Sequence, residues 1–267
     1  MPSSQPKIAL VTGASSGIGR AAAIALQDQG YRVFGTSRGQ GKQAPGIEGL
    51  RLDVDSDSSA KACVAAVLKN AGKLDVLVNN AGYLLAGAVE ECTAREIKAQ
   101  FETNYLGVVR MTQAVLPAMR KSGRGHIITV SSLAGLVPVP FWGHYNASKF
   151  AVEGLMETLR VELRPLGIQV CMVEPGAIKT AFYSRPTAKS MPAYAVRRRN
   201  QVLVMQGFDA KAVGPEAVGE RIARLAQDPH PALRNLVTKE ARLFTFMRWL
   251  MPAGVNEAIT RAAFKQG

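Results

Sequence analysis

Cysteine is scarce in this sequence of 267 residues, which contains only Cys63, Cys92 and Cys171. An odd number of cysteines without a CxxC pair argues against a disulfide framework and a zinc site, and it suits a reducing compartment. No stretch approaches the ~18 consecutive apolar residues of a transmembrane helix, and the polar segment 1–6 lacks the apolar core of a secretory signal. We therefore expect a cytoplasmic protein without a metal ion.

Acidic residues are few beside basic ones, 20 against 33, and the net charge is +13. Residues 1–180 hold 19 basic and 14 acidic side chains, whereas residues 181–267 hold 14 and 6. Such an excess could attract nucleic acid, anionic lipid or a phosphorylated ligand, and it could also be a basic solvated surface. Because no recognition helix or aromatic-studded basic stripe accompanies the charge, we expect no nucleic-acid partner.

Apolar runs alternate with helical stretches over the first two thirds of the chain. Parallel strands that are buried on both faces have such continuous apolar runs. The pattern predicts an α/β fold with a doubly wound parallel sheet of Rossmann type, in a single domain spanning 1–267. The expected strands are 7–11, 31–36, 49–54, 74–79, 126–131 and 168–174, and the expected helices are 17–29, 56–70, 94–119 and 145–163.

The alternating pattern weakens after Pro175. Residues 181–208 contain two prolines and the run Arg197-Arg198-Arg199, which indicates a long loop with helical pieces. We expect a substrate lid at about 181–210 and C-terminal helices at about 215–265.

A glycine-rich turn, TGASSGIG, lies between the first expected strand and the first expected helix. Glycines there permit a tight turn, and backbone N–H groups at the start of a helix can approach a pyrophosphate. A glycine-rich turn alone is weak evidence, but its place as the first strand-to-helix turn of a doubly wound sheet favours dinucleotide binding. The candidate cofactor residues of this turn are Gly13, Ser15, Ser16, Gly17, Ile18 and Gly19.

Tyr145 and Lys149 are spaced i, i+4 at the start of an expected helix, which places them on one face. A tyrosine has an unperturbed pKa of about 10, and a cation roughly 5 Å away lowers that pKa by about two units. This would make the phenol a usable general acid or base. Ser132 lies at the carboxyl end of a strand, where its hydroxyl could bind a substrate oxygen.

Together these motifs resemble a short-chain dehydrogenase/reductase. The resemblance covers roughly residues 5–180, because TGASSGIG, LDV, NNAG, the serine with YxxxK, and EPG occur in the family's order. It implies Tyr145 as the catalytic acid/base, Lys149 as the residue that lowers its pKa and holds the nicotinamide ribose, and Ser132 as the group that orients the substrate oxygen. It also implies that Asn104 maintains a water-linked proton relay to the lysine.

The same resemblance implies further contacts with the cofactor. Asp53 and Val54 are similar to an adenine-binding pair, and Asn79 to the residue beside the adenosine ribose, at the start of a turn that includes Ala81 and Gly82. The residues expected on the carboxamide side of nicotinamide are Pro175, Gly176, Ile178 and Thr180.

The second expected strand ends without an acid, in Thr36-Ser37-Arg38. Enzymes that select NAD place an acid there to bind the ribose 2′-OH, whereas Arg38 can pair with a 2′-phosphate. We therefore expect NADP(H), bound through Arg38 with help from Ser37 and Thr36. Ser16 stands where some family members carry a second basic residue.

The substrate is expected to be a small, lipophilic molecule, because segment 133–142 is almost wholly apolar. This segment and the end of the second strand are similar to the branch with hydroxysteroid and retinol dehydrogenases. An apolar loop could also pack only against the core. His144 is expected to be a bystander.

Segment 239–251 has an apolar arc that could cover the cleft, pack in a homo-oligomer (dimer or tetramer), or make weak contact with a membrane surface. Trp249 falls among its polar residues. For the protein as a whole, a non-catalytic NADP(H) sensor or scaffold is the alternative to an enzyme, and the intact set Ser132, Tyr145, Lys149 and Asn104 argues against it.

Overall fold

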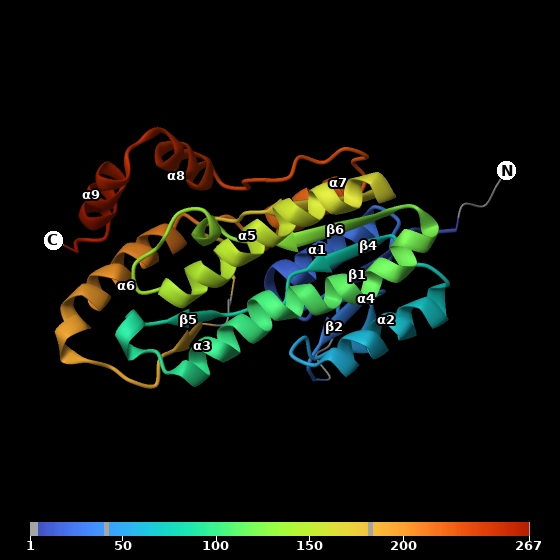
Figure 1. Ribbon diagram of the computed structural model, residues 1–267, viewed down its shortest axis with the longest axis horizontal. Coiled ribbons are helices and arrows are strands. Elements are labelled where there is room, and N and C mark those ends of the chain that lie inside the picture. Colours follow the sequence, from blue (N-terminus) through green and yellow to red (C-terminus); the bar gives the residue numbers. More distant parts are fainter. Residues whose placement is uncertain (1–4, 40–42, 181–183, 267) are drawn as a thin grey trace.

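Six parallel strands form the central sheet of this computed structural model, which describes residues 5–39, 43–180 and 184–266. The strands lie in the order β3-β2-β1-β4-β6-β7 (Figure 1), so the chain reverses its direction of winding between β1 and β4. The expected doubly wound α/β fold is confirmed. The strands are β1 (Ile8–Val11), β2 (Arg32–Ser37), β3 (Glu48–Arg51), β4 (Val76–Asn79), β6 (Gly125–Val130) and β7 (Ile168–Val173).

Helices cover both faces of this sheet. The helices over one face are α2 (Asp57–Ala71), α4 (Gly107–Ser122) and α5 (Gly143–Leu163). Those over the other face are α1 (Gly17–Asp28) and α7 (Pro215–Leu225).

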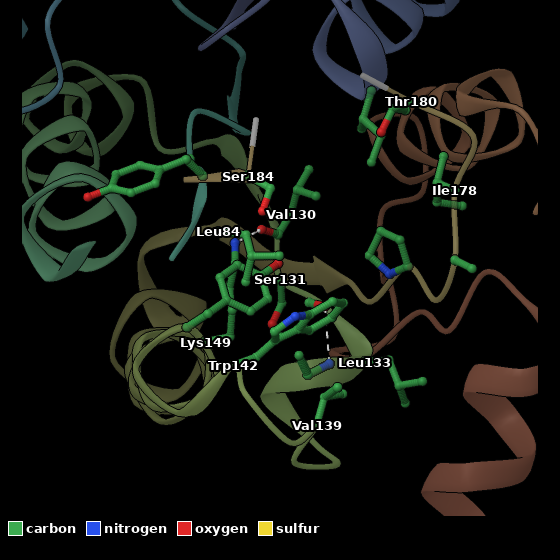
Figure 2. A pocket seen from close by; sticks show the side chains of 18 of the residues that line it. Leu84, Val130, Ser131, Leu133, Val139, Trp142, Lys149, Ile178, Thr180 and Ser184 are labelled. Atoms are coloured by element: carbon green, nitrogen blue, oxygen red, sulfur yellow. Dashed lines mark hydrogen bonds between the residues drawn. The ribbon is translucent and has the colours of Figure 1, made fainter. Parts of the chain in front are cut away.

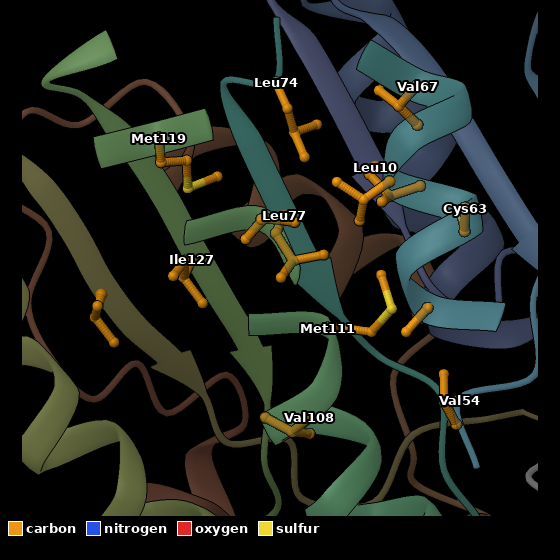
Figure 3. Packing of buried hydrophobic residues seen from close by; sticks show 14 of the residues in the cluster. Leu10, Val54, Cys63, Val67, Leu74, Leu77, Val108, Met111, Met119 and Ile127 are labelled. Atoms are coloured by element: carbon orange, nitrogen blue, oxygen red, sulfur yellow. The ribbon is translucent and has the colours of Figure 1, made fainter. Parts of the chain in front are cut away.

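Neighbouring residues of each strand enter opposite cores, which is why the strands are apolar throughout. Leu10 and Ile127 pack with Met111 of α4 (Figure 3), whereas Val11 and Ile128 belong to the core under α1 and α7. All five side chains are fully buried. Burying a side chain of this size stabilises the fold by ~1.5–3 kcal/mol, so the two cores fix the sheet and the positions of its carboxyl ends.

The expected helix 94–119 is interrupted. It consists of α3 (Ala94–Phe101), the π-helical turn η2 (Glu102–Leu106) and α4. Asn104 is buried within the π-helical turn. Such turns are frequent at functional sites because they displace backbone groups from the regular ladder.

The lid segment contains more regular structure than its sequence indicated. β8 (Ser184–Pro186) pairs in parallel with β5 (Leu84–Ala86), and the arginine run lies in the 15-residue helix α6 (Ala195–Asp209). The expected long loop with helical pieces thus contains one long helix and a short strand. Gln201 is the one residue classed as buried among the described residues of α6, so the helix has little of the apolar periodicity by which helices are recognised in a sequence.

Helices α8 (Lys239–Leu250) and α9 (Ala253–Ala263) follow α7 and lie near α6, at the end of the molecule away from the N-terminus (Figure 1). Within the described ranges, no helix has the length and apolar character needed to cross a membrane.

Candidate active site

A cavity of about 700 Å³ opens at the carboxyl edge of the sheet and extends to the lid and the C-terminal helices. It begins beside the ends of β1 and β4, where open α/β sheets bind ligands. Most of the site residues expected from the sequence line it. They are Gly13, Ser15, Ser16, Gly17, Ile18, Ser37, Arg38, Asp53, Val54, Ala81, Gly82, Ser132, Tyr145, Lys149, Pro175, Gly176, Ile178 and Thr180.

The glycine-rich turn has the shape of an anion cradle. Gly13 and Gly17 have φ angles of +68° and +53°, which side chains with a Cβ rarely adopt. A Cβ on Gly19 would collide with the carbonyl oxygen of Gly13, so Gly19 serves close packing and does not line the cavity. Within the described residues, Ser16 caps α1 without a side-chain hydrogen bond, which leaves backbone N–H groups at the helix start for a phosphate.

Asn80 braces this turn from the neighbouring strand. Its Nδ2 donates to the carbonyl oxygens of Thr12 (2.9 Å) and Gly13 (3.2 Å), and the Thr12 hydroxyl accepts from the backbone N–H groups of Asn80 and Ala81. The sequence reasoning assigned no role to Asn80, although it follows the end of β4 directly.

Asn79, which was expected beside the adenosine ribose, points the other way. Its side chain is buried and donates to the hydroxyls of Thr112 (3.4 Å) and Thr129 (3.5 Å). Because Asn79 is the last residue of β4, the alternation of the strand directs its side chain into the core under α4. The side chain of Asn79 therefore faces the core, and a contact of Asn79 with the adenosine ribose stays a prediction for its backbone.

Arg38 lies where the 2′-phosphate of a ribose would bind. It follows β2, is exposed to solvent and lines the cavity, beside Ser37 and Thr36. The Ser37 hydroxyl donates to the carbonyl oxygen of Gly39 (2.7 Å), which holds the turn after the strand. A guanidinium, which stays charged at neutral pH, fits a dianionic phosphate at this edge.

Tyr145, Lys149 and Ser132 meet on the cavity wall. Tyr145 and Lys149 lie one turn apart on α5, and Ser132 follows β6 and forms a hydrogen bond with the Tyr145 hydroxyl. The Lys149 ammonium donates to the carbonyl oxygen of Val130 (2.9 Å) and lies 5.9 Å from the centre of the Tyr145 ring. Figure 2 shows Lys149 and Trp142 on one side of the pocket and Ile178 and Thr180 on the other.

Burial governs the acidity of both groups. Burial raises the pKa of Tyr145 to about 12, although the hydrogen bond with Ser132 lowers this pKa. It lowers the pKa of Lys149 to about 8, although the nearby Glu153 carboxylate raises it. The expected lowering of the tyrosine pKa by the lysine is corrected, since that expectation left out the desolvation of both groups. The Tyr145 phenol therefore keeps its proton at neutral pH.

Asn104 lies behind this wall and does not line the cavity. Its Oδ1 accepts from the backbone N–H of Tyr83 (3.0 Å), and its Nδ2 donates to the Tyr83 carbonyl (2.9 Å) and the Ser148 hydroxyl (3.3 Å). The side chain therefore positions the segment after β4 against α5. Its part in a proton relay stays a prediction.

The far part of the cavity is mostly apolar. Leu84, Ala134 and Tyr145 form a buried cluster, and Trp142 packs edge-on against the Tyr145 ring at 6.0 Å. The apolar segment 133–142 thus lines the cavity and does more than fill the core. The lid and C-terminal helices add the apolar side chains Val202, Met205, Phe208, Phe244, Ile259 and Phe264, together with the polar or charged Gln201, Gln206, Asp209, Glu240 and Thr260. His144 lies outside this lining, as expected of a bystander.

Buried glutamates that the sequence reasoning missed anchor the lid. Glu91 is fully buried, accepts from the backbone N–H groups of Met191 (2.7 Å) and Ala88 (2.9 Å), and pairs with Arg198 of α6. Glu96 accepts from the backbone N–H of Ala188 (2.7 Å). Clustered glutamates before a helix resemble a solvated surface in a sequence, so only the fold identifies them as anchors.

The described parts of the chain hold no cluster of His, Cys, Asp or Glu suited to a metal ion. Tyr145, Lys149 and Ser132 lie between the glycine-rich turn and the more apolar part of the cavity.

This fold and this site define a protein that binds a nicotinamide dinucleotide for redox chemistry. The family model for the short chain dehydrogenase matches residues 7–190, and the chain belongs to the short-chain dehydrogenase/reductase family. The oxidoreductase class predicted from the motifs is confirmed.

Relatives over nearly the whole chain carry more specific names. The chain is 38% identical to a 3-ketodihydrosphingosine reductase of Bacteroides thetaiotaomicron, over 87% of this chain and 88% of that protein. It is 35% identical to a 17-beta-hydroxysteroid dehydrogenase type 1 of Mus musculus, over 93% of this chain and 78% of that protein. The expected likeness to the branch with hydroxysteroid dehydrogenases is confirmed.

Solved structures agree on the fold. A short-chain dehydrogenase from Streptomyces avermitilis has a TM-score of 0.85 and 34% identity, and the match covers 97% of this chain and 96% of that one. Two others differ in cofactor. ElxO with NADP bound has a TM-score of 0.71 and 26% identity, over 87% and 97% of the chains. A Burkholderia phymatum reductase in complex with NAD has a TM-score of 0.80 and 26% identity, over 93% and 95%.

Proposed function

We propose that this protein is an NADP(H)-dependent oxidoreductase that interconverts a carbonyl and an alcohol on a lipophilic substrate, mainly as a reductase. The observation that carries the proposal is the continuous cavity in which a dinucleotide cradle leads to the Tyr145 hydroxyl and then to an apolar chamber. We further propose a cytoplasmic location and a homo-oligomeric state.

The residues of the site account for the proton and for orientation. The bound cofactor supplies the hydride. Ser132 orients the substrate oxygen through its hydroxyl, and Tyr145, held protonated by burial, donates the proton that this oxygen gains on reduction. Lys149 presents an ammonium on the same wall, where it would hold the nicotinamide ribose.

The preference for NADP(H) rests on the end of β2. Arg38 offers a guanidinium, and Ser37 stands where an acid would repel a phosphate. One charge-assisted contact is worth ~1.5–3 kcal/mol, or roughly ten- to a hundredfold in affinity. The preference for NADPH should be of this size.

The lipophilic substrate is supported by the lining of the far chamber. Leu84, Val139 and Trp142 pack with Tyr145 and line the cavity, and the lid adds further apolar side chains. A polar sugar beside these apolar side chains would lose water partners for most of its hydroxyls without gaining protein ones. Relatives named for ketodihydrosphingosine and hydroxysteroids act on molecules of the same apolar character.

A panel of carbonyls and alcohols, followed by NADPH and NADH absorbance, tests the proposal. We expect turnover of steroid, retinoid or long-chain carbonyls with NADPH, and weak turnover of sugars. Failure of every lipophilic carbonyl would contradict the substrate class. A protein that binds NADPH but turns over nothing would be the sensor or scaffold.

A further inference from the structure

A second ionisable group lies behind the catalytic wall, one turn of α5 beyond Lys149. Glu153 is 4% exposed and does not line the cavity, so it does not reach substrate or cofactor. It lies on the same helix face as Lys149 because the two are spaced i, i+4. A buried carboxylate needs partners, and those of Glu153 come from outside α5.

Both carboxylate oxygens of Glu153 are engaged. The Ser131 hydroxyl donates to Oε1 (2.6 Å), and Nε of Arg234 donates to Oε2 (2.9 Å). Gly135 permits this packing, since a Cβ there would lie 2.9 Å from Oγ of Ser131 and 3.2 Å from Cγ of Glu153. The acid is therefore fixed in place beside the lysine.

Arg234 also pairs with Glu157, one turn further along α5. The Glu157 side chain is 48% exposed, against 5% for Glu153. The arginine thus joins an exposed acid and a buried one, and only the buried acid is close enough to Lys149 to affect its pKa.

Other buried acids near this network have hydrogen-bond partners of their own. Glu174, after β7, is fully buried, accepts from the backbone N–H of Asn235 (2.6 Å), and has its pKa raised to about 8, first by burial and then by the charge of Glu153. On α5 itself, Tyr145 is the other ionisable residue that lines the cavity with Lys149. Glu96 of α3 accepts a hydrogen bond from the backbone N–H of Ala188. The 3-10 helix η3 (Leu133–Gly135) and β5 contribute no ionisable side chain.

We propose that Glu153 is a positioning residue that keeps Lys149 charged inside the cavity, with Ser131 and Arg234 holding its carboxylate in place. The inference rests on the proposed function, because it assigns Glu153 to the lysine of that active site. Burial alone lowers the pKa of Lys149, and the Glu153 carboxylate opposes this shift. Without Glu153, Lys149 would lose its proton at a lower pH, and fewer molecules would hold an ammonium at neutral pH.

Lysine NMR of the full chain tests this without turnover. The Lys149 Cε resonance, assigned with Lys149→Arg, should titrate with a midpoint near 8 in the wild type. In Glu153→Gln we expect the midpoint to fall by about one pH unit, from the loss of one nearby charge that Arg234 partly offsets. In the matched control Glu157→Gln, which keeps Glu153 and Arg234 paired, we expect no change.

Kinetics give a second readout. The high-pH limb of kcat/KM for carbonyl reduction should move toward acid in Glu153→Gln by the same amount as the NMR midpoint, and it should stay in place in Glu157→Gln. If Glu153→Gln does not fold, Glu153→Met removes the charge with a side chain suited to an apolar site, and the same shift is expected.

An unchanged Lys149 midpoint in the folded Glu153 variant, or an equal shift in Glu157→Gln, would overturn the inference. A loss of thermal stability without a change of midpoint would show that Glu153 only supports the fold. Complete lack of turnover in the wild type would overturn the proposed function instead, and the NMR titration would still decide whether Glu153 sets the charge of Lys149.

Discussion

The two ends of the cavity are built by different means. At the sheet end, backbone groups and fully buried strands place the site, and a mutation there meets close packing, as at Gly19. At the lid end, α6, α8 and α9 carry large exposed apolar side chains such as Leu203, Phe246 and Trp249. The ion pair of Arg198 with the buried Glu91 anchors α6.

This difference separates chemistry from substrate choice. In the proposed function the sheet end holds the proton donor and the cofactor, and its close packing tolerates little change. The lid end has few residues in the main cores, so it can vary without disturbing the sheet. Variants at the sheet end should therefore change turnover and cofactor affinity, and variants at the lid end should change KM for large substrates.

Among variants at the sheet end, only removal of the Tyr145 hydroxyl should lower turnover more than loss of Lys149. Lys149→Ala is expected to lower kcat by roughly a hundredfold or more and to weaken NADPH binding about tenfold, because one ammonium serves both ribose and phenol. Steady-state kinetics and fluorescence titration with NADPH measure the two effects. Lys121→Ala, at an exposed lysine of α4, is the control and should change neither.

The cofactor preference should reverse by roughly ten- to a hundredfold in Ser37→Asp with Arg38→Leu, because the change removes the phosphate partner and adds an acid for the ribose hydroxyl. The ratio of kcat/KM with NADPH and with NADH measures it. Equal ratios in the wild type and the double variant would show that Arg38 is only a surface arginine.

At the lid end, Glu91→Gln should raise KM for long apolar substrates about tenfold while leaving NADPH affinity unchanged, since it removes the charge that Arg198 and two backbone N–H groups share. Glu90→Gln is the matched control. Glu90 is the exposed neighbour, bonded to the Tyr194 hydroxyl (2.7 Å), and its change should have a much smaller effect. An equal loss of affinity for NADPH in Glu91→Gln would contradict the separation of the two ends.

The sequence was a good guide to the sheet end because strand burial and short motifs are local features. Continuous apolar runs predicted the strands, and spacing brought Tyr145 and Lys149 together. The sequence did not show in which direction a side chain at the end of a strand points. Asn79 and Asn80 are adjacent and chemically identical, and only the alternation of β4 decides which one braces the glycine-rich turn.

The sequence said less about long-range polar contacts. Arg234 lies 81 residues from Glu153, and Arg198 lies 107 residues from Glu91, so no local pattern connects them. The bounds of α6 were not predicted, although helical pieces were expected there, because the helix mixes charged and apolar side chains and has no clear buried face. Such features follow from tertiary packing, which the helix propensities of single residues do not predict.

Tyr145→Phe tests the central claim most directly, because it removes one hydroxyl and almost no volume from a buried site. Turnover of the best carbonyl with NADPH, and NADPH affinity by fluorescence titration, should be measured on the same preparation. We expect kcat to fall by about a thousandfold or more while NADPH affinity stays within about twofold. Activity within tenfold of the wild type would contradict the account, since Tyr145 would then not be the proton donor.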